Sequence, residues 1–432
     1  MDIEQIYKKA EREVDQAAVS VIKTEVTQVR FSNNKIDISN RWNVEGASVF
    51  LAKEGRTFMF DLKDENDIDR TLSFSLKALK NSGKNEDFYS LSDRRYSYRK
   101  PSTNNVKLRA IDEESFVNDF IDQIRPFVKR TGGVFYKKDM TQEVKTPFNQ
   151  GSQETYGVEF VARAFSGPDY PVQISFMTST DRDISMLHKQ GDEIIDMARN
   201  IKNVKEGKDG KYNVIFHPLC FASIVSYTIP MASAFQVDSG MSFFANRMGE
   251  RVGNSAFTMY DDPTDDSMIG ARVFDDEGTS TRKTPVIEKG QVKNYLHNYS
   301  TAKKYGTETT GNAGIVAPTP WQISVEPGNE ELDDMISSTK KGLYIVNTWY
   351  TRFQDYREGV FSTIPRDGIF LIENGEIRET WNGIRISDSL LNIYKHIEGI
   401  SRETKSVKWW DETLPTRSPF VSVSEVNISR SK

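Results

Sequence analysis

The stretch from Phe274 to Gly314 holds the residues whose types and spacing are most suggestive of chemistry. It opens with an acidic turn, Asp275-Asp276-Glu277-Gly278, and closes with the small residues Thr309 to Gly314. Carboxylates in a turn can bind a divalent cation. Small residues at such density let backbone approach another segment or a ligand closely. The stretch therefore predicts either a tight packing corner or a ligand site.

Histidines and further carboxylates give a second set of candidates. The chain has four histidines, and His217 is notable because it lies where a buried strand meets a helix. The acidic run 261–266 and the acidic turn could bind a cation, although neither has a recognisable ligand spacing. No Walker loop, GxSxG or HExxH pattern occurs in the sequence. We expect no catalytic residues, no metal ligands and no cofactor in this chain.

The elements that position these residues predict an α+β fold. The first 22 residues are predicted to form an amphipathic helix, and alternating segments up to residue 61 predict an antiparallel meander. A break at Gly207-Lys208-Asp209-Gly210 suggests a boundary. We predict an N-terminal α+β domain over 1–206, with an antiparallel sheet and flanking helices. A strand-rich, barrel- or sandwich-like C-terminal domain is predicted over 207–432.

Composition limits the possible functions further. The net charge of −5 and the lack of a basic stripe make nucleic-acid binding an unattractive hypothesis. The single cysteine, Cys220, cannot form an intrachain disulfide. No apolar run approaches the ~20 residues of a membrane span, and the N-terminus is too charged for a signal peptide. We expect a cytoplasmic protein with no membrane association.

The stretch from Phe274 to Gly314 resembles the TldD/PmbA family, which comprises TldD and TldE (also called PmbA). FDDEG, followed by Leu296, Ala302, Gly306 and Thr310-Gly311-Asn312-Ala313, is similar to a characteristic block of that family. Further similar segments are Asn34-Lys35-Ile36, residues 45–49, 359–362 and 368–377, and Leu391-Asn392-Ile393. The resemblance thus covers nearly the whole chain.

The TldD branch carries HExxxH at the strand-to-helix junction, where two histidines bind zinc and the glutamate activates water. Here His217 is kept, but Pro218 stands at the glutamate and Ala222 at the second histidine. Without a carboxylate base and a second imidazole, this position is a degenerate metal site. The resemblance therefore implies the non-catalytic, TldE/PmbA-like subunit of a TldD–TldE metallopeptidase. Its implied partners are a TldD-type zinc subunit and an unfolded peptide cleaved at the partner's zinc.

On this interpretation, the stretch from Phe274 to Gly314 shapes the wall of a cavity that holds peptide. The candidate peptide or cavity residues are Asp275, Glu277, Gly278, Thr310, Gly311, Asn312, Ala313 and Gly314. Two alternatives stay open. One is a stand-alone hydrolase with an unrecognised metal site made from the acidic runs and His217. The other is a non-enzymatic peptide-binding homodimer, to which the family's label as a modulator of DNA gyrase would belong.

Overall fold

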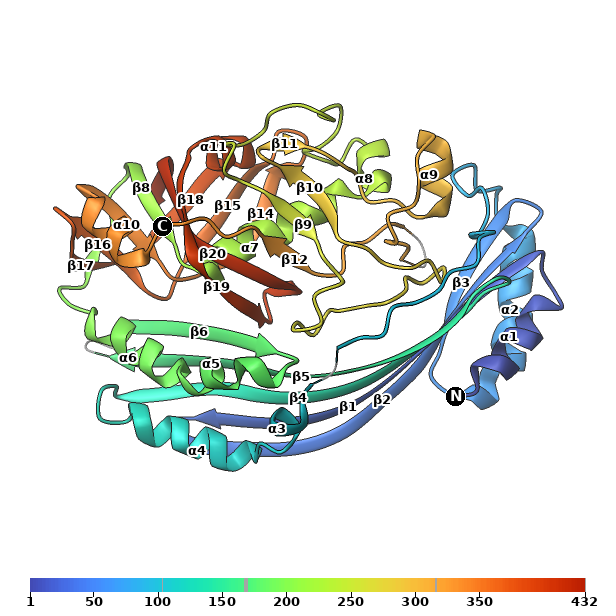
Figure 1. Ribbon diagram of the computed structural model, residues 1–432, viewed down its shortest axis with the longest axis horizontal. Helices are drawn as coiled ribbons and strands as arrows, with labels where there is room; N and C mark the ends of the chain where they lie inside the picture. Colours follow the sequence, from blue (N-terminus) through green and yellow to red (C-terminus); the bar gives the residue numbers. More distant parts are fainter. Residues whose placement is uncertain (103, 167–169, 315–316, 432) are drawn as a thin grey trace.

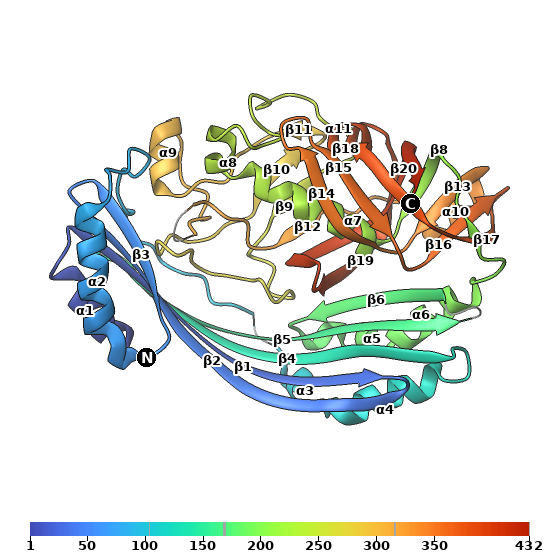
Figure 2. The same cartoon turned by 180° about the vertical axis from the view of Figure 1, so that it is seen from behind.

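The structure is a computed structural model that describes residues 1–102, 104–166, 170–314 and 317–431. It confirms the predicted α+β class. A curled antiparallel sheet is built from the N-terminal part of the chain, and a strand-rich layer from the C-terminal part lies over it (Figures 1 and 2). The predicted division into domains at residues 206 and 207 stays a prediction.

The N-terminal sheet has six antiparallel strands in the order β3-β2-β1-β4-β5-β6. Their bounds are β1 Gln16–Ser32, β2 Lys35–Lys53, β3 Arg56–Leu62, β4 Arg130–Lys145, β5 Gln150–Ser166 and β6 Tyr170–Thr178. Asn33 and Asn34 connect β1 to β2 with φ of 48° and 63°, which asparagine tolerates better than most residues. The resulting long hairpin runs the length of the curved sheet (Figure 1).

Helices pack on this sheet at its two ends. They are α1 Ile3–Glu11, α2 Ile68–Asn81, α3 Val106–Arg109, α4 Glu113–Ile124, α5 Ile184–His188 and α6 Gln190–Arg199. The prediction of a helix across the first 22 residues is wrong. Helix α1 is capped by the Asp2 side chain and ends at Glu11. The β-branched, apolar segment from Gln16 to Ile22 instead pairs with β2 and β4, where tertiary packing overrides local helix propensity.

The C-terminal part forms a branched sheet with short helices. Its strands are β7 Lys205–Glu206, β8 Gly210–Phe216, β9 Met259–Asp261, β10 Thr284–Glu288, β11 Gln291–Val292, β12 Ile323–Val325, β13 Lys341–Ile345, β14 Thr348–Asp355, β15 Val360–Pro365, β16 Ile369–Glu373, β17 Glu376–Asn382, β18 Ile384–Ser389, β19 Ile397–Trp409 and β20 Glu412–Arg430. Its helices are α7 Pro218–Thr228, α8 Ala234–Asp238, α9 Tyr299–Tyr305, α10 Leu332–Ser338 and α11 Leu390–Lys395. No helix in the described ranges is both long and apolar enough to cross a membrane.

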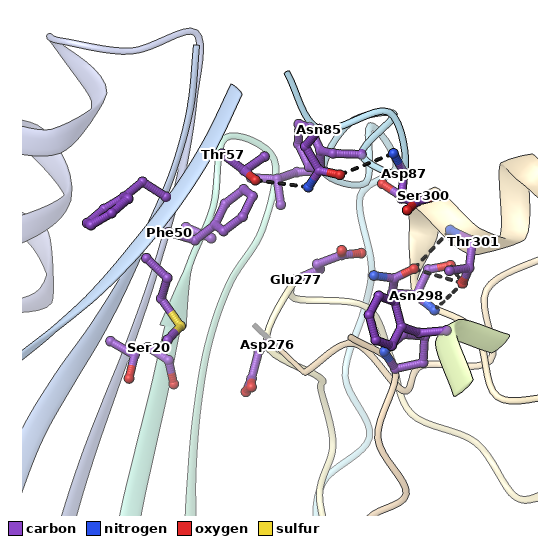
Figure 3. A pocket seen from close by; sticks show the side chains of 18 residues that line it. Ser20, Phe50, Thr57, Asn85, Asp87, Asp276, Glu277, Asn298, Ser300 and Thr301 are labelled. Atoms are coloured by element: carbon purple, nitrogen blue, oxygen red, sulfur yellow. Dashed lines mark hydrogen bonds between the residues drawn. The ribbon is translucent and has the colours of Figure 1, made fainter. Parts of the chain in front are cut away.

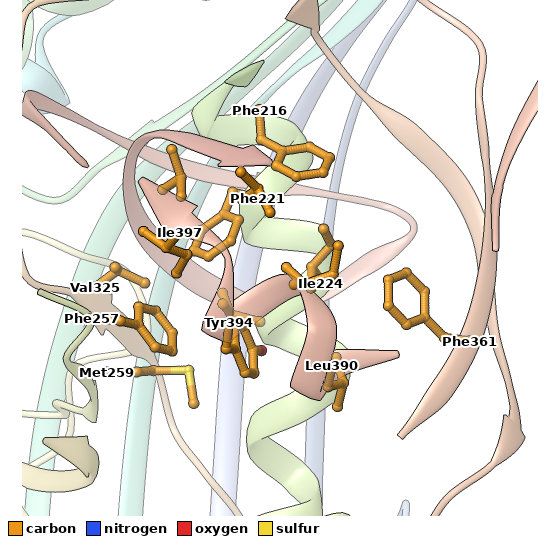
Figure 4. Packing of buried hydrophobic residues seen from close by; sticks show 14 of the residues in the cluster. Phe216, Phe221, Ile224, Phe257, Met259, Val325, Phe361, Leu390, Tyr394 and Ile397 are labelled. Atoms are coloured by element: carbon orange, nitrogen blue, oxygen red, sulfur yellow. The ribbon is translucent and has the colours of Figure 1, made fainter. Parts of the chain in front are cut away.

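Helix α7 is the centre of the C-terminal core. Ten of its eleven residues are buried, so it is apolar on every side and must be enclosed. Phe221 and Ile224 of α7 pack in one cluster with Phe257 of a loop, Phe361 of β15 and Tyr394 of α11 (Figure 4). The strand-rich layer therefore wraps around a buried helix that begins immediately after His217.

The N-terminal sheet and the C-terminal strands share a second core. Ile194 and Met197 of α6 belong to one buried cluster with Phe160 of β5 and with Tyr344 and Phe370 of β13 and β16. At the other end of the molecule, loop 82–102 joins the two layers. The Tyr299 hydroxyl donates to Asp93 at 2.8 Å, and the Tyr89 backbone N–H donates to Ser300 Oγ at 3.0 Å. The two layers are thus held together at both ends.

Candidate functional site

A cavity of about 340 Å³ lies between the N-terminal sheet and the loops around α9 (Figure 3). Three parts of the chain line it. Strands β1, β2 and β3 contribute Ser20, Phe50 and Met59, among others. Loop 82–102 contributes Phe88 and Asp87, and the C-terminal part contributes Phe235, Asp276, Glu277 and Asn298. The volume is at the lower end of the range of small-ligand pockets, which is 300–1,000 Å³ in general.

The acidic turn is folded by its first carboxylate. Asp275 is fully buried, and its Oδ1 accepts the backbone N–H groups of Glu277 at 3.0 Å and Thr279 at 2.8 Å. Gly278 completes the turn with φ of +73°, a conformation that favours glycine. Burial raises the pKa of Asp275 to about 7, although hydrogen bonds from backbone N–H groups oppose this shift. Asp275 therefore organises backbone and does not face the cavity.

The small-residue segment packs directly behind this turn. The Ala313 N–H donates to Asp275 Oδ2 at 2.9 Å, and the Asp276 N–H donates to the Ala313 carbonyl at 2.9 Å. Gly311 has φ of +75°, and a Cβ atom there would lie 2.6 Å from the Ser280 carbonyl oxygen. The close backbone approach expected from the small residues is thus present, and its neighbour is the protein's own chain.

Thr310, Asn312 and Gly314 also make internal contacts. The His297 N–H donates to Thr310 Oγ1 at 2.7 Å, and the Gly314 N–H donates to the Ala317 carbonyl at 3.1 Å. The Asn312 side-chain amide donates to Asp261 Oδ2 at 2.5 Å. None of the residues from Thr310 to Gly314 lines the cavity, and neither does Gly278. The small residues form the support of the wall. The residues of the stretch 274–314 that line the cavity are Asp276, Glu277, Asn298, Ser300 and Thr301.

Glu277 is the distinctive group of the cavity. Its side chain is only 7% exposed, and Oε2 accepts the Tyr299 N–H of α9 at 3.1 Å. Burial raises the pKa of this carboxyl well above its usual value, and Asp275 raises it further. Asp276 differs because Arg272 Nη2 pairs with it at 2.7 Å. Of these two cavity carboxyls, Glu277 is the one without a cationic partner in the described part of the chain.

The degenerate metal site lies elsewhere and has a structural role. His217 is the N-cap of α7, and its Nδ1 accepts the Leu219 N–H at 3.1 Å. Nε2 therefore carries the proton and donates to Glu193 Oε1 at 3.1 Å, and Lys405 binds the other Glu193 oxygen at 2.9 Å. Burial lowers the pKa of His217, so the imidazole is neutral. Both ring nitrogens already have partners within the chain.

A zinc site of the HExxxH type does not fit this environment. Burial opposes the ionisation of Glu193, but the charge of Lys405 and the hydrogen bond from His217 lower the pKa of Glu193 to about 2, so Glu193 is ionised and pairs with Lys405. Pro218 begins helix α7 and offers no carboxylate. Ala222 is fully buried in a cluster with Leu219 and Trp409, where an imidazole has no room. His217, Pro218 and Ala222 all lie outside the cavity lining.

The acidic run 261–266 is also committed to internal contacts. Asp262 pairs with Lys283 at 3.3 Å, whereas Asp265 and Asp266 pair with Arg417 and Arg99 at 2.5 and 2.7 Å. Asp261 accepts the Trp321 N–H at 2.8 Å. Among the residues that the structure describes, no group of three or more His, Cys, Asp and Glu side chains is arranged to hold a metal ion.

Several cavity residues were not anticipated from the sequence. Asn298 caps α9 with a reciprocal capping box to Thr301, and the Asn-x-x-Thr spacing could have revealed this. Ser20 and Phe50 face the cavity from β1 and β2, far from Glu277 in the chain. Finding them required the curvature of the sheet and the way in which the C-terminal layer lies over it.

The fold is that of known TldE-type proteins. TldE from Thermococcus kodakarensis superposes with a TM-score of 0.86 at 19% identity, with 99% of both chains covered. A protein of Thermotoga maritima, described as a candidate modulator of a DNA gyrase, gives 0.85 at 21% identity, again over 99% of both chains. At these identities the likeness establishes the fold alone.

Sequence comparison establishes the family. The pattern of the PmbA/TldA metallopeptidase C-terminal domain matches residues 209–430, and that of PmbA/TldA metallopeptidase domain 1 matches residues 17–81. The chain belongs to the PmbA/TldD metallopeptidase family.

Individual relatives agree with this assignment. A metalloprotease of Methanocaldococcus jannaschii is 28% identical over 230 residues, which is 50% of this chain and 51% of that protein. The chain thus spans about half the length of that relative. A zinc metalloprotease TldD homologue of Saccharolobus solfataricus is 24% identical over 314 residues, or 68% of this chain and 69% of its own length.

Proposed function

We propose that this chain is the non-catalytic, TldE/PmbA-like subunit of a TldD–TldE metallopeptidase. It encloses unfolded peptides and helps to bind them for cleavage at the partner's zinc site. The observation that carries the proposal is the locked environment of His217. Its two ring nitrogens are bonded to Leu219 and Glu193, and Pro218 and Ala222 supply neither a base nor a second imidazole.

The geometry of the N-terminal sheet supports a peptide-holding role. β3 is the outermost strand of its sheet and pairs with β2. Its residues Thr57, Phe58 and Met59 line the cavity. An extended peptide can add to a sheet edge through backbone hydrogen bonds, with side chains entering neighbouring pockets. A peptide held along β3 would place one side chain or its terminus in the cavity beside Glu277.

The test is reconstitution with a TldD-type protein from the same source. Cleavage of an unstructured peptide is measured with each chain alone and with both together, and complex formation is followed by size-exclusion chromatography. We expect a complex whose activity far exceeds the sum of its parts and disappears when the motif glutamate of the TldD-type chain is replaced by glutamine. Absence of a complex and of any gain in cleavage would refute the proposal. Peptide binding by this chain alone, with no cleavage in the mixture, would favour a non-enzymatic peptide binder.

A further inference from the structure

The charges around the cavity are unbalanced. Its charged lining residues are Asp87, Asp276 and Glu277, and no Lys, Arg or His side chain from the described residues joins them. Asp276 is paired with Arg272 at 2.7 Å, and Asp87 lies 3.1 Å from Lys304. Two of the three carboxylates thus have partners outside the lining, whereas Glu277 has none.

Glu277 offers a free acceptor to the cavity. Only Oε2 is engaged, by the Tyr299 N–H at 3.1 Å, although the side chain is 7% exposed. No donor in the described chain bonds to Oε1. Figure 3 shows the Glu277 side chain among the residues around the cavity, near Asn298 and opposite the sheet. Buried carboxylates are normally paired, so this oxygen is a suitable acceptor for a ligand cation.

Ser20 lines the opposite wall of the cavity, but its hydroxyl does not open into it. The Ser20 Oγ has no hydrogen-bond partner and is itself fully buried, so a ligand in the cavity does not reach it. Glu277 is therefore the unpartnered charged group that the cavity offers to a ligand.

The remaining walls are apolar. Phe50, Met59, Phe88 and Phe235 surround the polar groups, and the volume of about 340 Å³ accommodates the end of a chain or one side chain. A ligand that fits must combine a donor-rich, positively charged end with an apolar stem. An ammonium group has three donors and no acceptor, which matches a carboxylate oxygen that needs a donor.

We propose that this cavity binds a primary ammonium group on an apolar stem, with the Glu277 carboxyl as its acceptor, ionised in the complex. In a peptide this group is either the N-terminal amine or a lysine side chain. The proposal rests on the peptide-holding role proposed above and names the feature of the peptide that is held. Asn298 and Asn85 complete the polar rim without adding charge.

Binding to the isolated full-length chain tests this proposal without the partner. Isothermal titration compares three amidated peptides of alanine and leucine: one with a free N-terminus, its N-acetylated form, and the acetylated form with one lysine. Binding of the first but not the second identifies the N-terminal amine, and recovery with the third identifies the lysine side chain. Equal binding of all three, or binding of none, overturns the proposal. Reconstituted cleavage is measured separately, so a failed ammonium site can be told from a failed subunit role.

Variants of this chain locate the site. Glu277→Gln keeps an acceptor for the Tyr299 N–H but removes the charge, and should weaken binding of the ammonium peptide tenfold or more. Asp87→Asn is the matched control, since Asp87 also lines the cavity but is paired with Lys304 at 3.1 Å. It should leave binding of the ammonium peptide within about twofold of the original chain.

Each variant has a decisive outcome. Binding by Glu277→Gln within twofold of the original chain overturns the assignment of Glu277. Equal effects of Glu277→Gln and Asp87→Asn overturn it as well. Should Glu277→Gln fail to fold, as judged by its urea midpoint, the acetylated peptide still decides the question.

Discussion

Replacement of Gly311 by alanine should destabilise the protein by far more than the same change at Gly306. Both glycines have positive φ, +75° and +63°, so either alanine incurs about 1–2 kcal/mol of backbone strain. Alanine also lowers the conformational entropy of the unfolded chain relative to glycine, which stabilises both variants by about 0.4–1 kcal/mol. The two sites differ in the space available for the added methyl group. At Gly306 nothing lies within 4 Å of the added Cβ, whereas at Gly311 the Ser280 carbonyl oxygen lies 2.6 Å away and Thr281 Cα 2.8 Å away.

The backbone opposite Gly311 cannot easily move away from an added methyl group. Ser280 is bridged to Phe274, and the Thr281 N–H donates to the Val273 carbonyl at 3.3 Å. Forcing a methyl group into well-packed surroundings costs about 1–3 kcal/mol. We therefore expect a loss of about 2–4 kcal/mol for Gly311→Ala and about 1 kcal/mol for Gly306→Ala. Gly311→Val should be more severe and should prevent either folding or peptide capture.

Urea unfolding followed by tryptophan fluorescence is the suitable assay. The Trp321 indole N–H donates to the Gly311 carbonyl at 2.9 Å, so one fluorophore reports directly on this contact. Midpoints are compared at equal m values, because a changed m would mean a changed unfolding reaction. If the two alanine variants lose the same stability within about 0.5 kcal/mol, close backbone approach is not what requires glycine at position 311.

The remaining predictions concern the former metal position. His217→Ala should cost about 1–2 kcal/mol through loss of the α7 cap, and His217→Asn should recover part of this because asparagine is a good N-cap; equal urea midpoints for the two variants would contradict the capping role. The folded-state pKa of Glu193, about 2, lies below its unfolded value, so its stabilisation is complete above about pH 4.5 and lost as pH falls towards 2. Glu193→Gln should remove up to about 3 kcal/mol of stability at pH 7 and flatten the acid limb of a stability–pH profile; an unchanged profile would refute this linkage. Introducing Pro218→Glu together with Ala222→His should not create a zinc site, because His217 is engaged and position 222 is packed; stoichiometric zinc by elemental analysis in a folded variant would show that the site can be rebuilt.

Local signals in the sequence were sufficient for much of the fold. The turn at Asn33-Asn34 and the hairpin turn at Lys289-Gly290 follow from short-range turn chemistry and lie where the sequence indicates. The second strand of that hairpin, expected over residues 292–296, is limited to Gln291–Val292. The first helix was predicted too long, because the apolar residues from Gln16 to Ile22 fit both the helical and the strand periodicity. Pairing with β2 makes this segment a strand.

The site was harder to predict than the fold. Glu277 was a candidate because it lies in a distinctive turn, and Gly311 because small residues indicate close approach. Nothing in the sequence near Ser20 distinguishes it from other serines on strands. It faces Glu277 only because β1 curves beneath a layer formed more than 200 residues later, and such long-range juxtapositions leave no local pattern.

The double attachment of the two layers has a kinetic consequence. Helix α6 is packed into the core shared by both layers, and Tyr299 and Ser300 bind loop 82–102 at the opposite end. Walls fastened on both sides cannot swing shut on a ligand, so adaptation is limited to side-chain rotamers on the nanosecond scale. Peptide association measured by stopped flow should then be a single step whose observed rate rises linearly with peptide concentration. The cavity would then select ligands by whether they fit through an opening whose width does not change.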